Sequence, residues 1–116
     1  MMPTDISYAF YLLGEECKKD SQRWFPLLHD DKTALPIQAH FALGLMGEAG
    51  ELCNLVKKAI RAADIKELED REDVAGEIAD VFIYLVDFAH SLGYNVWDCY
   101  EAKHKELVQR WGKEVG

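Results

Sequence analysis

The sequence predicts an all-α protein, folded as a bundle of four helices in one domain that covers residues 1–116. Apolar residues recur at steps of three and four along most of the chain, which is the spacing of an amphipathic helix. No stretch shows the period-two alternation that marks a half-buried strand. The length of 116 residues suits a single domain and leaves little room for a second one.

The first helix is predicted to run from Thr4 or Asp5, either of which can cap it, to about Lys19. The segment 21–36 contains two prolines and a polar cluster, so it is predicted to be mostly loop. The second of these prolines suits the first turn of a long second helix over 37–63, because the first turn leaves its amide hydrogens unbonded anyway.

Residues 64–70 form a short charged connection to a third helix, which is predicted over 71–91 with Gly93 just beyond its end. Asn95 and the aspartate three residues later have the spacing of a capping box, so a fourth helix is predicted to begin there and to continue to about Trp111. Since the second and third helices are long and joined by a short connection, we expect them to lie antiparallel at the centre of the bundle.

The chain is acidic, with 13 lysines and arginines against 21 aspartates and glutamates and a formal net charge of −8. Such a surface repels a phosphate backbone, which argues against nucleic-acid binding through a basic face. A smaller phosphate ligand would need a metal cation between it and the protein.

The sequence features that bear on location predict a soluble cytoplasmic protein. The short apolar run 6–13 follows Asp5 rather than a basic region, so it predicts neither a signal peptide nor a membrane span. Cys17, Cys53 and Cys99 lie far apart and form no CxxC pair, which disfavours a zinc site or a disulfide framework. We expect them to be reduced thiols that fill the core.

Two pairs of carboxylates lie on the two central helices. Glu48 with Glu51, and Glu77 with Asp80, are three residues apart, so the members of each pair project from one helix face. Both pairs lie beside apolar stripes that are predicted to face the core, namely Ala42, Leu45, Ala49, Leu52, Val56, Ala59 and Ala63 on the second helix and Val74, Ile78, Val81, Leu85, Phe88 and Leu92 on the third. Antiparallel packing can bring the pairs face to face; the alternative is two separate solvated acidic faces.

Glycines beside the first carboxylate pair favour a functional interpretation. Gly44, Gly47 and Gly50 lie inside the predicted second helix, where each glycine costs about 1 kcal/mol relative to alanine. Their presence there suggests close approach by a ligand or by another helix.

Four facing carboxylates repel one another unless they are protonated or bridged by cations. Oxygen donors without histidine or thiolate partners suit Mg²⁺, with Mn²⁺ as a second possibility. Magnesium commonly completes its coordination with substrate phosphate oxygens. An acidic site that holds Mg²⁺ is therefore a candidate site for a nucleotide polyphosphate.

The two pairs read ExxE, 25 intervening residues, then ExxD, within GEAGE and EIAD. This pattern and the residues around it, over about 35–94, resemble the MazG-like branch of the all-α nucleoside triphosphate pyrophosphohydrolases. The resemblance implies a MazG-like four-helix bundle that assembles as a homodimer or a dimer of dimers. It also implies Mg²⁺-dependent hydrolysis of (deoxy)nucleoside triphosphates between the α- and β-phosphates, in a role of clearing unwanted nucleotides.

The resemblance implies that Glu48, Glu51, Glu77 and Asp80 hold the metal. One of the first pair, with Glu48 preferred to Glu51, would also orient or deprotonate the attacking water. The base and sugar preference and the number of metals do not follow from the sequence.

Six further residues are candidates for substrate binding. Lys58 lies seven residues after Glu51 on nearly the same face and can meet a phosphate. Near the C-terminus the family often has a lysine, an asparagine four residues later and an arginine three further on; here the asparagine position holds Leu107. The remaining candidates are Lys103 and Arg110 for phosphate, Trp24 and Phe25 for stacking on the base, and His40.

Two other functions fit parts of the pattern. A carboxylate-bridged di-iron bundle would use the DxxH at 87–90 and the ExxH at 101–104. A non-catalytic helical interaction module would simply expose its acidic stripe to solvent.

Overall fold

The computed structural model describes residues 5–30, 36–69 and 71–112, and these residues contain helices and no strand. The all-α class is therefore confirmed for the described part of the chain. The elements are α1 (Asp5–Trp24), the 3₁₀ helix η1 (Pro26–His29), α2 (Ile37–Ala62), the single turn α3 (Lys66–Glu69), α4 (Glu72–Ser91) and α5 (Val96–Trp111). Four long helices were predicted, and four are present at nearly the predicted positions; Thr4, offered as one start of the first helix, lies outside the described residues.

The loop prediction for 21–36 was wrong for its first half. Helix α1 continues five residues past Lys19 to Trp24, and Pro26 then opens η1. The buried Ser21 explains this continuation, because its hydroxyl bonds Nε2 of His29 at 2.8 Å and its carbonyl accepts the amide hydrogen of Phe25 at 2.8 Å. A proline begins a helix as readily as it ends one, since the first turn has no use for its missing amide hydrogen.

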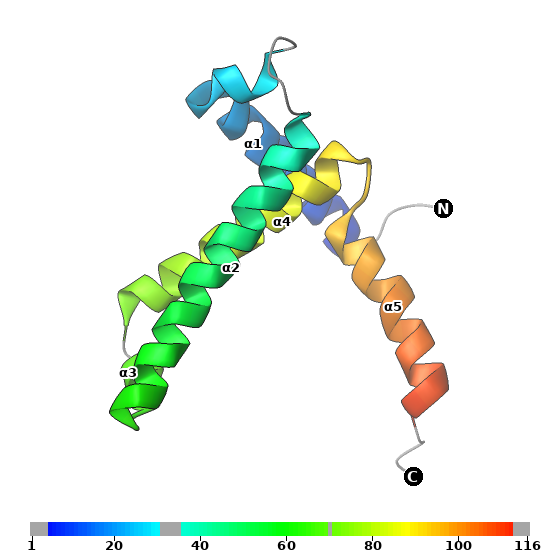
Figure 1. The fold of residues 1–116 in the computed structure, drawn as a ribbon. Coiled ribbons are helices and arrows are strands. Elements are labelled where there is room, and N and C mark those ends of the chain that lie inside the picture. Colours follow the sequence, from blue (N-terminus) through cyan, green and yellow to red (C-terminus); the bar gives the residue numbers. More distant parts are fainter. Residues whose placement is uncertain (1–4, 31–35, 70, 113–116) are drawn as a thin grey trace.

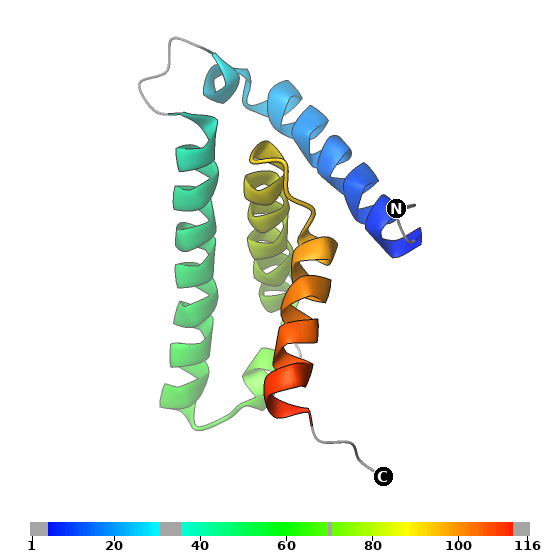
Figure 2. The same cartoon turned by 90° about the vertical axis from the view of Figure 1, so that its right-hand side faces the viewer.

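Helices α2 and α4 form the antiparallel central pair and lie side by side along their length (Figure 1, Figure 2). Helix α2 ends at Ala62, and the next residue, Ala63, caps it with a φ of 53° in the left-handed region. The predicted connection over 64–70 contains α3, and the Asp64 side chain accepts a hydrogen bond from the amide of Lys66 at 3.0 Å. This compact connection returns α4 alongside α2.

Helix α1 packs across α4, and α5 then leaves the other helices (Figure 1). The N-cap at Asn95 is confirmed, because its Oδ1 accepts from the amides of Trp97 at 2.9 Å and Asp98 at 3.3 Å, but the Asp98 side chain does not return the bond that would complete a capping box. Asn95 also donates to the Ser7 carbonyl at 3.0 Å, and the Ser7 hydroxyl donates to Asp98 at 2.8 Å. These bonds tie the first turn of α5 to α1, while the remainder of α5 extends away from α2.

The molecule is open, and its core is small. Its principal extents are 50 × 44 × 23 Å and its radius of gyration is 17.6 Å, whereas a compact chain of this length is expected to have about 13 Å. The buried hydrophobic side chains among the described residues are Cys17, Phe41, Leu55, Ala59 and Val86. Many large apolar side chains remain exposed instead.

The predicted core stripes are only partly buried. Phe41 and Leu55, two of the buried residues of α2, lie on the stripe that also carries Glu48 and Glu51. On α4, the predicted apolar stripe leaves Ile78, Leu85 and Leu92 exposed. The buried face of α2 therefore includes the positions around Glu48, and on α4 the buried Asp87 lies on the same face as Glu77 and Asp80. Both acidic pairs are thus next to the α2–α4 contact.

The prediction that all three cysteines fill the core was wrong for two of them. Cys17 is buried, whereas Cys53 and Cys99 are exposed, and all three are free thiols. Burial raises the pKa of the Cys17 thiol to about 11, with the charges of Asp87, Asp20 and Glu16 adding to the effect. Within the described residues, no helix is long and apolar enough to cross a membrane.

Candidate functional site

Three of the four predicted ligands meet in an acidic triad made of Glu48 and Glu51 from α2 and Glu77 from α4. One carboxylate oxygen from each side chain lies within 4.8 Å of the others. The two α2 residues are one turn apart on the same face, and antiparallel packing of α4 presents Glu77 to them. Since the chain segments come from both central helices, the triad bridges the α2–α4 contact.

Part of the triad is withdrawn from solvent without compensating hydrogen bonds. Glu48 and Glu77 are half-buried and Glu51 is exposed. The Oε2 atoms of Glu48 and Glu77 are both buried, and neither receives a hydrogen bond from a described residue while the two carboxyl groups are ionised. A buried carboxylate oxygen without a partner lowers the stability of the folded state. A proton or a bound cation at these atoms would remove that cost.

The crowding changes the acidity of Glu77, whose pKa is raised from 4.5 to about 7. The first cause is hydrogen bonding to Glu48, which Glu77 can offer only in its protonated form. Partial loss of solvent and the contact with Glu51 raise the pKa of Glu77 further. The three carboxyl groups therefore resist being ionised together unless a positive charge joins them.

Asp80, the fourth predicted ligand, lies one turn beyond Glu77 on α4 and outside the triad. It is exposed and lines the same pocket as Glu48. The structure thus brings Asp80 to the edge of the site rather than into the cluster of oxygens.

A pocket of about 510 Å³ opens beside the triad, between α1, α2 and α4. We call it the α1–α2–α4 pocket. Both predicted stacking residues, Trp24 and Phe25, line it together with Glu48 and Asp80. Its remaining lining residues are Cys17, Asp20, Ser21, Leu28, Phe41, Ile83, Tyr84 and Asp87. The pocket therefore combines aromatic side chains with carboxylates at its margins.

One of the three glycines of α2 has the predicted role of permitting close packing. A side-chain carbon on Gly44 would collide with the ring of Tyr84, a residue that lines the pocket. Gly47 and Gly50 have no atom of another group within 4 Å of such a carbon, so no described element approaches them. The α2–α4 contact thus requires glycine only at position 44.

The predicted cationic substrate contacts lie away from the pocket in this chain. Lys58 is exposed on α2, ten residues beyond Glu48. Lys103 and Arg110 are exposed on α5 and both pair with Glu106, at 3.2 and 3.1 Å. His40 is half-buried with an unpartnered Nε2, and it is not among the residues that line the pocket.

Sequence reasoning gave too little weight to Asp20, Tyr84 and Asp87. Asp87 is buried, and no ion pair joins it to another residue in the described part of the chain. Tyr84 and Asp87 follow Asp80 at steps of four and three residues, so all three lie on one face of α4, and this spacing is visible in the sequence. The place of Asp20 in the pocket could not be predicted from residue spacing, because it depends on how α1 crosses α4.

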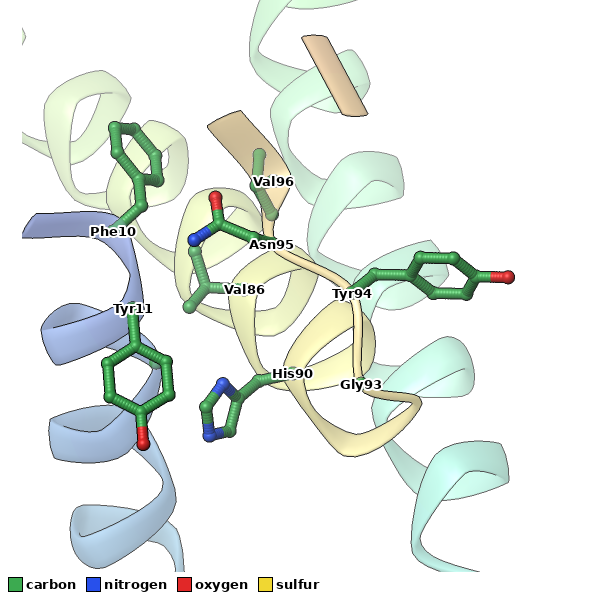
Figure 3. Close-up of a pocket in the computed structure, with 9 residues that line it drawn as sticks. Phe10, Tyr11, Val86, His90, Gly93, Tyr94, Asn95 and Val96 are labelled. Carbon is green, nitrogen blue, oxygen red and sulfur yellow. The ribbon is translucent and has the colours of Figure 1, made fainter. Parts of the chain in front are cut away.

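A second, smaller pocket of about 130 Å³ lies between α1 and the turn from α4 to α5 (Figure 3). His90 points into it beside Tyr11 and bonds Glu15 through Nε2 at 3.0 Å. His104 stacks on Tyr100 of α5 instead. In the described parts of the chain no histidine joins a cluster of three or more metal-ligating side chains, so the donor set of a di-iron site is not assembled.

Comparison with known proteins gives one partial match. No protein-family model matches the sequence, and no solved structure matches it. Over 60 residues the chain is 40% identical to the Gene 37 protein of Mycobacterium phage L5, a match that covers 51% of this chain and 51% of that protein. The chain thus spans about half the length of the curated relative it matches. That name states no activity, and the similarity alone assigns this chain to no family.

Proposed function

We propose that this protein is a Mg²⁺-dependent nucleoside triphosphate pyrophosphohydrolase of the MazG-like type. The observation that carries the proposal is the acidic triad, in which carboxylates from two antiparallel helices converge with two buried, unpartnered oxygens beside an aromatic pocket. A merely solvated acidic face would keep such oxygens in water. The products would be a nucleoside monophosphate and pyrophosphate.

The donor set of the triad fits a hard divalent cation. Glu48, Glu51 and Glu77 would hold Mg²⁺, or Mn²⁺ in its place, and Asp80 would complete the carboxylate set from the pocket edge. When bound, the cation supplies a positive charge that polarises the phosphate and lowers the pKa of a coordinated water. It also removes the conflict between an acidic protein and an anionic substrate.

Other steps, namely activation of the attacking water and binding of the nucleoside, are assigned to individual side chains of the pocket. Glu48 borders both the triad and the pocket, so it is the carboxylate best placed to orient the attacking water and to accept its proton, with Glu51 beside it. Trp24 and Phe25 offer stacking faces for the nucleoside, and such contacts contribute about 1–3 kcal/mol per base.

The open shape supports assembly as part of the same proposal. Lys103 and Arg110 lie on α5, which extends away from α2 (Figure 1) and contributes no residue to the pocket of its own chain, so we infer that they serve the site of a second copy. We propose a homodimer or a homotetramer in the cytoplasm, acting in nucleotide-pool housecleaning.

The decisive experiment is a product analysis. The purified protein is incubated with Mg²⁺ and a panel of ribo- and deoxyribonucleoside triphosphates, and pyrophosphate and monophosphate are quantified. Glu48→Gln and Glu77→Gln should lower the rate by at least about a hundred-fold, because each removes a charge at the reacting centre. The matched control is Glu72→Gln, an exposed glutamate in the first turn of α4, which should retain the full rate.

Three outcomes would contradict the proposal: orthophosphate as the product, full activity in the presence of a chelator, or full activity of Glu48→Gln. An interaction module would release nothing from any nucleotide, and Mg²⁺ would not change its melting temperature.

A further inference from the structure

Asp87 of α4 is a largely buried residue whose carboxylate oxygens, unlike Oε2 of Glu48 and Glu77, still contact solvent. Its residue is 7% exposed, and it makes no hydrogen bond or ion pair with the residues that the structure describes. Buried carboxylates are normally paired or hydrogen-bonded, since leaving one unpaired is costly. Lys18, His29 and His90 line a pocket of about 220 Å³ on one side of Asp87, but none of them lies within ion-pair distance of its carboxylate.

The other side of Asp87 faces the α1–α2–α4 pocket. Asp80 and Asp87 are seven residues apart, which is two turns on one face of α4 or about 10.5 Å along its axis. Glu48 and Phe41 are separated in the same way on the antiparallel α2, and both pairs line the pocket. The pocket therefore has a triad end, at Glu48 and Asp80, and a buried end, at Phe41 and Asp87.

We propose that the buried end of this pocket reads the nucleobase through Asp87, and that it selects a base whose edge offers two adjacent N–H donors, which among the common bases is guanine. The inference rests on the proposed function, because the phosphates must lie at the triad end for the base to reach Asp87. It adds the substrate preference that the sequence leaves open.

The selection follows from the chemistry of a carboxylate. An ionised carboxylate only accepts hydrogen bonds, and its two oxygens can receive N1–H and N2–H of guanine together. Uracil and thymine present one N–H between two carbonyl oxygens, which would repel the carboxylate. Adenine and cytosine present one amino donor beside a ring nitrogen that is itself an acceptor.

Two features around Asp87 strengthen the preference for guanine: its ionised state at alkaline pH and the neighbouring carboxylate of Asp20. Burial raises the pKa of Asp87 to about 6, with the charge of Asp20 as a second cause, so Asp87 is ionised at pH 8. Asp20 lines the same pocket from α1 and adds further acceptor oxygens. A base edge rich in donors satisfies both groups, whereas an edge rich in acceptors leaves them unpaired.

The test compares kcat/KM for dGTP, dATP, dCTP and dTTP at pH 8 with Mg²⁺. We expect dGTP to exceed dTTP by roughly ten- to a hundred-fold, the factor that one hydrogen bond to a charged group provides. Asp87→Asn should reduce the value for dGTP by a similar factor and should not reduce that for dTTP, because the amide removes the repulsion from the thymine carbonyl oxygens. Asp73→Asn, an exposed aspartate on the same helix, is the matched control and should keep the wild-type order.

Binding of a nucleoside monophosphate in the presence of Mg²⁺ gives an independent measurement, because it needs no turnover. GMP at millimolar concentration should raise the melting temperature of the wild-type protein more than TMP does, and Asp87→Asn should abolish the difference. If Asp87→Asn does not fold, which far-ultraviolet circular dichroism would show, the wild-type panel and the GMP measurement still test the preference.

Failure of this inference differs from failure of the proposed function. Equal release of pyrophosphate from all four nucleotides, or an unchanged order in Asp87→Asn, would overturn base reading by Asp87 and leave the hydrolysis intact. Release from none, together with selective binding of GMP, would overturn the hydrolysis and support the reading of the base.

Discussion

At the scale of single residues, the chemistry of the protein is concentrated in carboxyl groups that the fold withdraws from water. The raised pKa of Glu77, about 7, means that the folded chain holds a proton between pH 4.5 and 7 that the unfolded chain has lost. The same applies to Asp87 between its ordinary value of 3.8 and about 6. In this interval the folded state binds more protons than the unfolded state, so these groups lower stability as the pH rises.

We therefore predict that the metal-free protein loses melting temperature between pH 5 and pH 7.5, and that Mg²⁺ restores it at pH 7.5 but has little effect at pH 5. A cation binds the ionised triad of the folded state only, and protons compete with it at low pH. Differential scanning calorimetry in the presence of a chelator or Mg²⁺ measures both effects.

Glu77→Gln supplies the control for this prediction. At pH 7.5 without metal it should melt above the wild type, because an amide relieves the repulsion, and it should lose most of the response to Mg²⁺. Glu72→Gln should behave as the wild type. A melting temperature of Glu77→Gln at or below that of the wild type would show that the triad is not electrostatically crowded.

The triad could be predicted from the sequence, whereas the buried end of the pocket could not. Glu48, Glu51 and Glu77 needed only the three-residue spacing and an antiparallel pair of helices, and both are readable from the pattern. Asp87 has the same spacing on α4, but its burial depends on where α1 crosses, and no local pattern encodes that crossing.

At the scale of helices, the α2–α4 contact depends on one small residue. Gly44→Ala places a methyl group against the ring of Tyr84, so α2 and α4 must separate beside the pocket. Overpacking costs about 1–3 kcal/mol, which exceeds the gain of about 1 kcal/mol that alanine brings to a helix. We predict a net loss of stability, measured by urea denaturation.

Gly76→Ala on α4 is the matched control, because a methyl group there meets nothing within 4 Å. It should raise the free energy of unfolding by up to about 1 kcal/mol. A Gly44→Ala variant that gains stability in the same way would indicate that Tyr84 yields without disturbing the helix pair.

The helix boundaries show what local chemistry determines. Pro36 and the Asn95 cap mark ends that were predicted within a residue, because each satisfies or removes hydrogen-bonding groups at a helix terminus. The extension of α1 to Trp24 was missed, since it depends on the bond between Ser21 and His29, eight residues apart. The direction of α5 could not be predicted either, because hydrophobic periodicity identifies which face of a helix is apolar but not which element packs against that face.

At the scale of the whole molecule, the open shape predicts self-association. Leu43 and Met46 are 64% and 73% exposed on one face of α2, where Gly47 and Gly50 would allow another helix to approach closely. We predict that the protein is a dimer or larger at micromolar concentration, and that Leu43→Lys with Met46→Lys dissociates it. Sedimentation equilibrium measures both.

Ala75→Lys, an exposed alanine near the start of α4, is the control for added charge and should leave the association unchanged. A wild-type protein that sediments as a monomer, or a double variant that stays associated, would contradict the assignment of this face.

Hydrogen bonds between Ser7 of α1 and the residues Asn95 and Asp98 hold α5 at one end, so a small rotation there moves its other end by a larger distance. The hydrogen bonds between α5 and α1 lie at the first turn of α5, and its sixteen residues extend about 24 Å from there. A rotation of about 10° at this pivot therefore displaces the far end, where Arg110 lies, by about 4 Å. The contacts at one end of α5, which are these hydrogen bonds and the packing of Phe10 against Trp97, therefore influence the position of Arg110 at the other end.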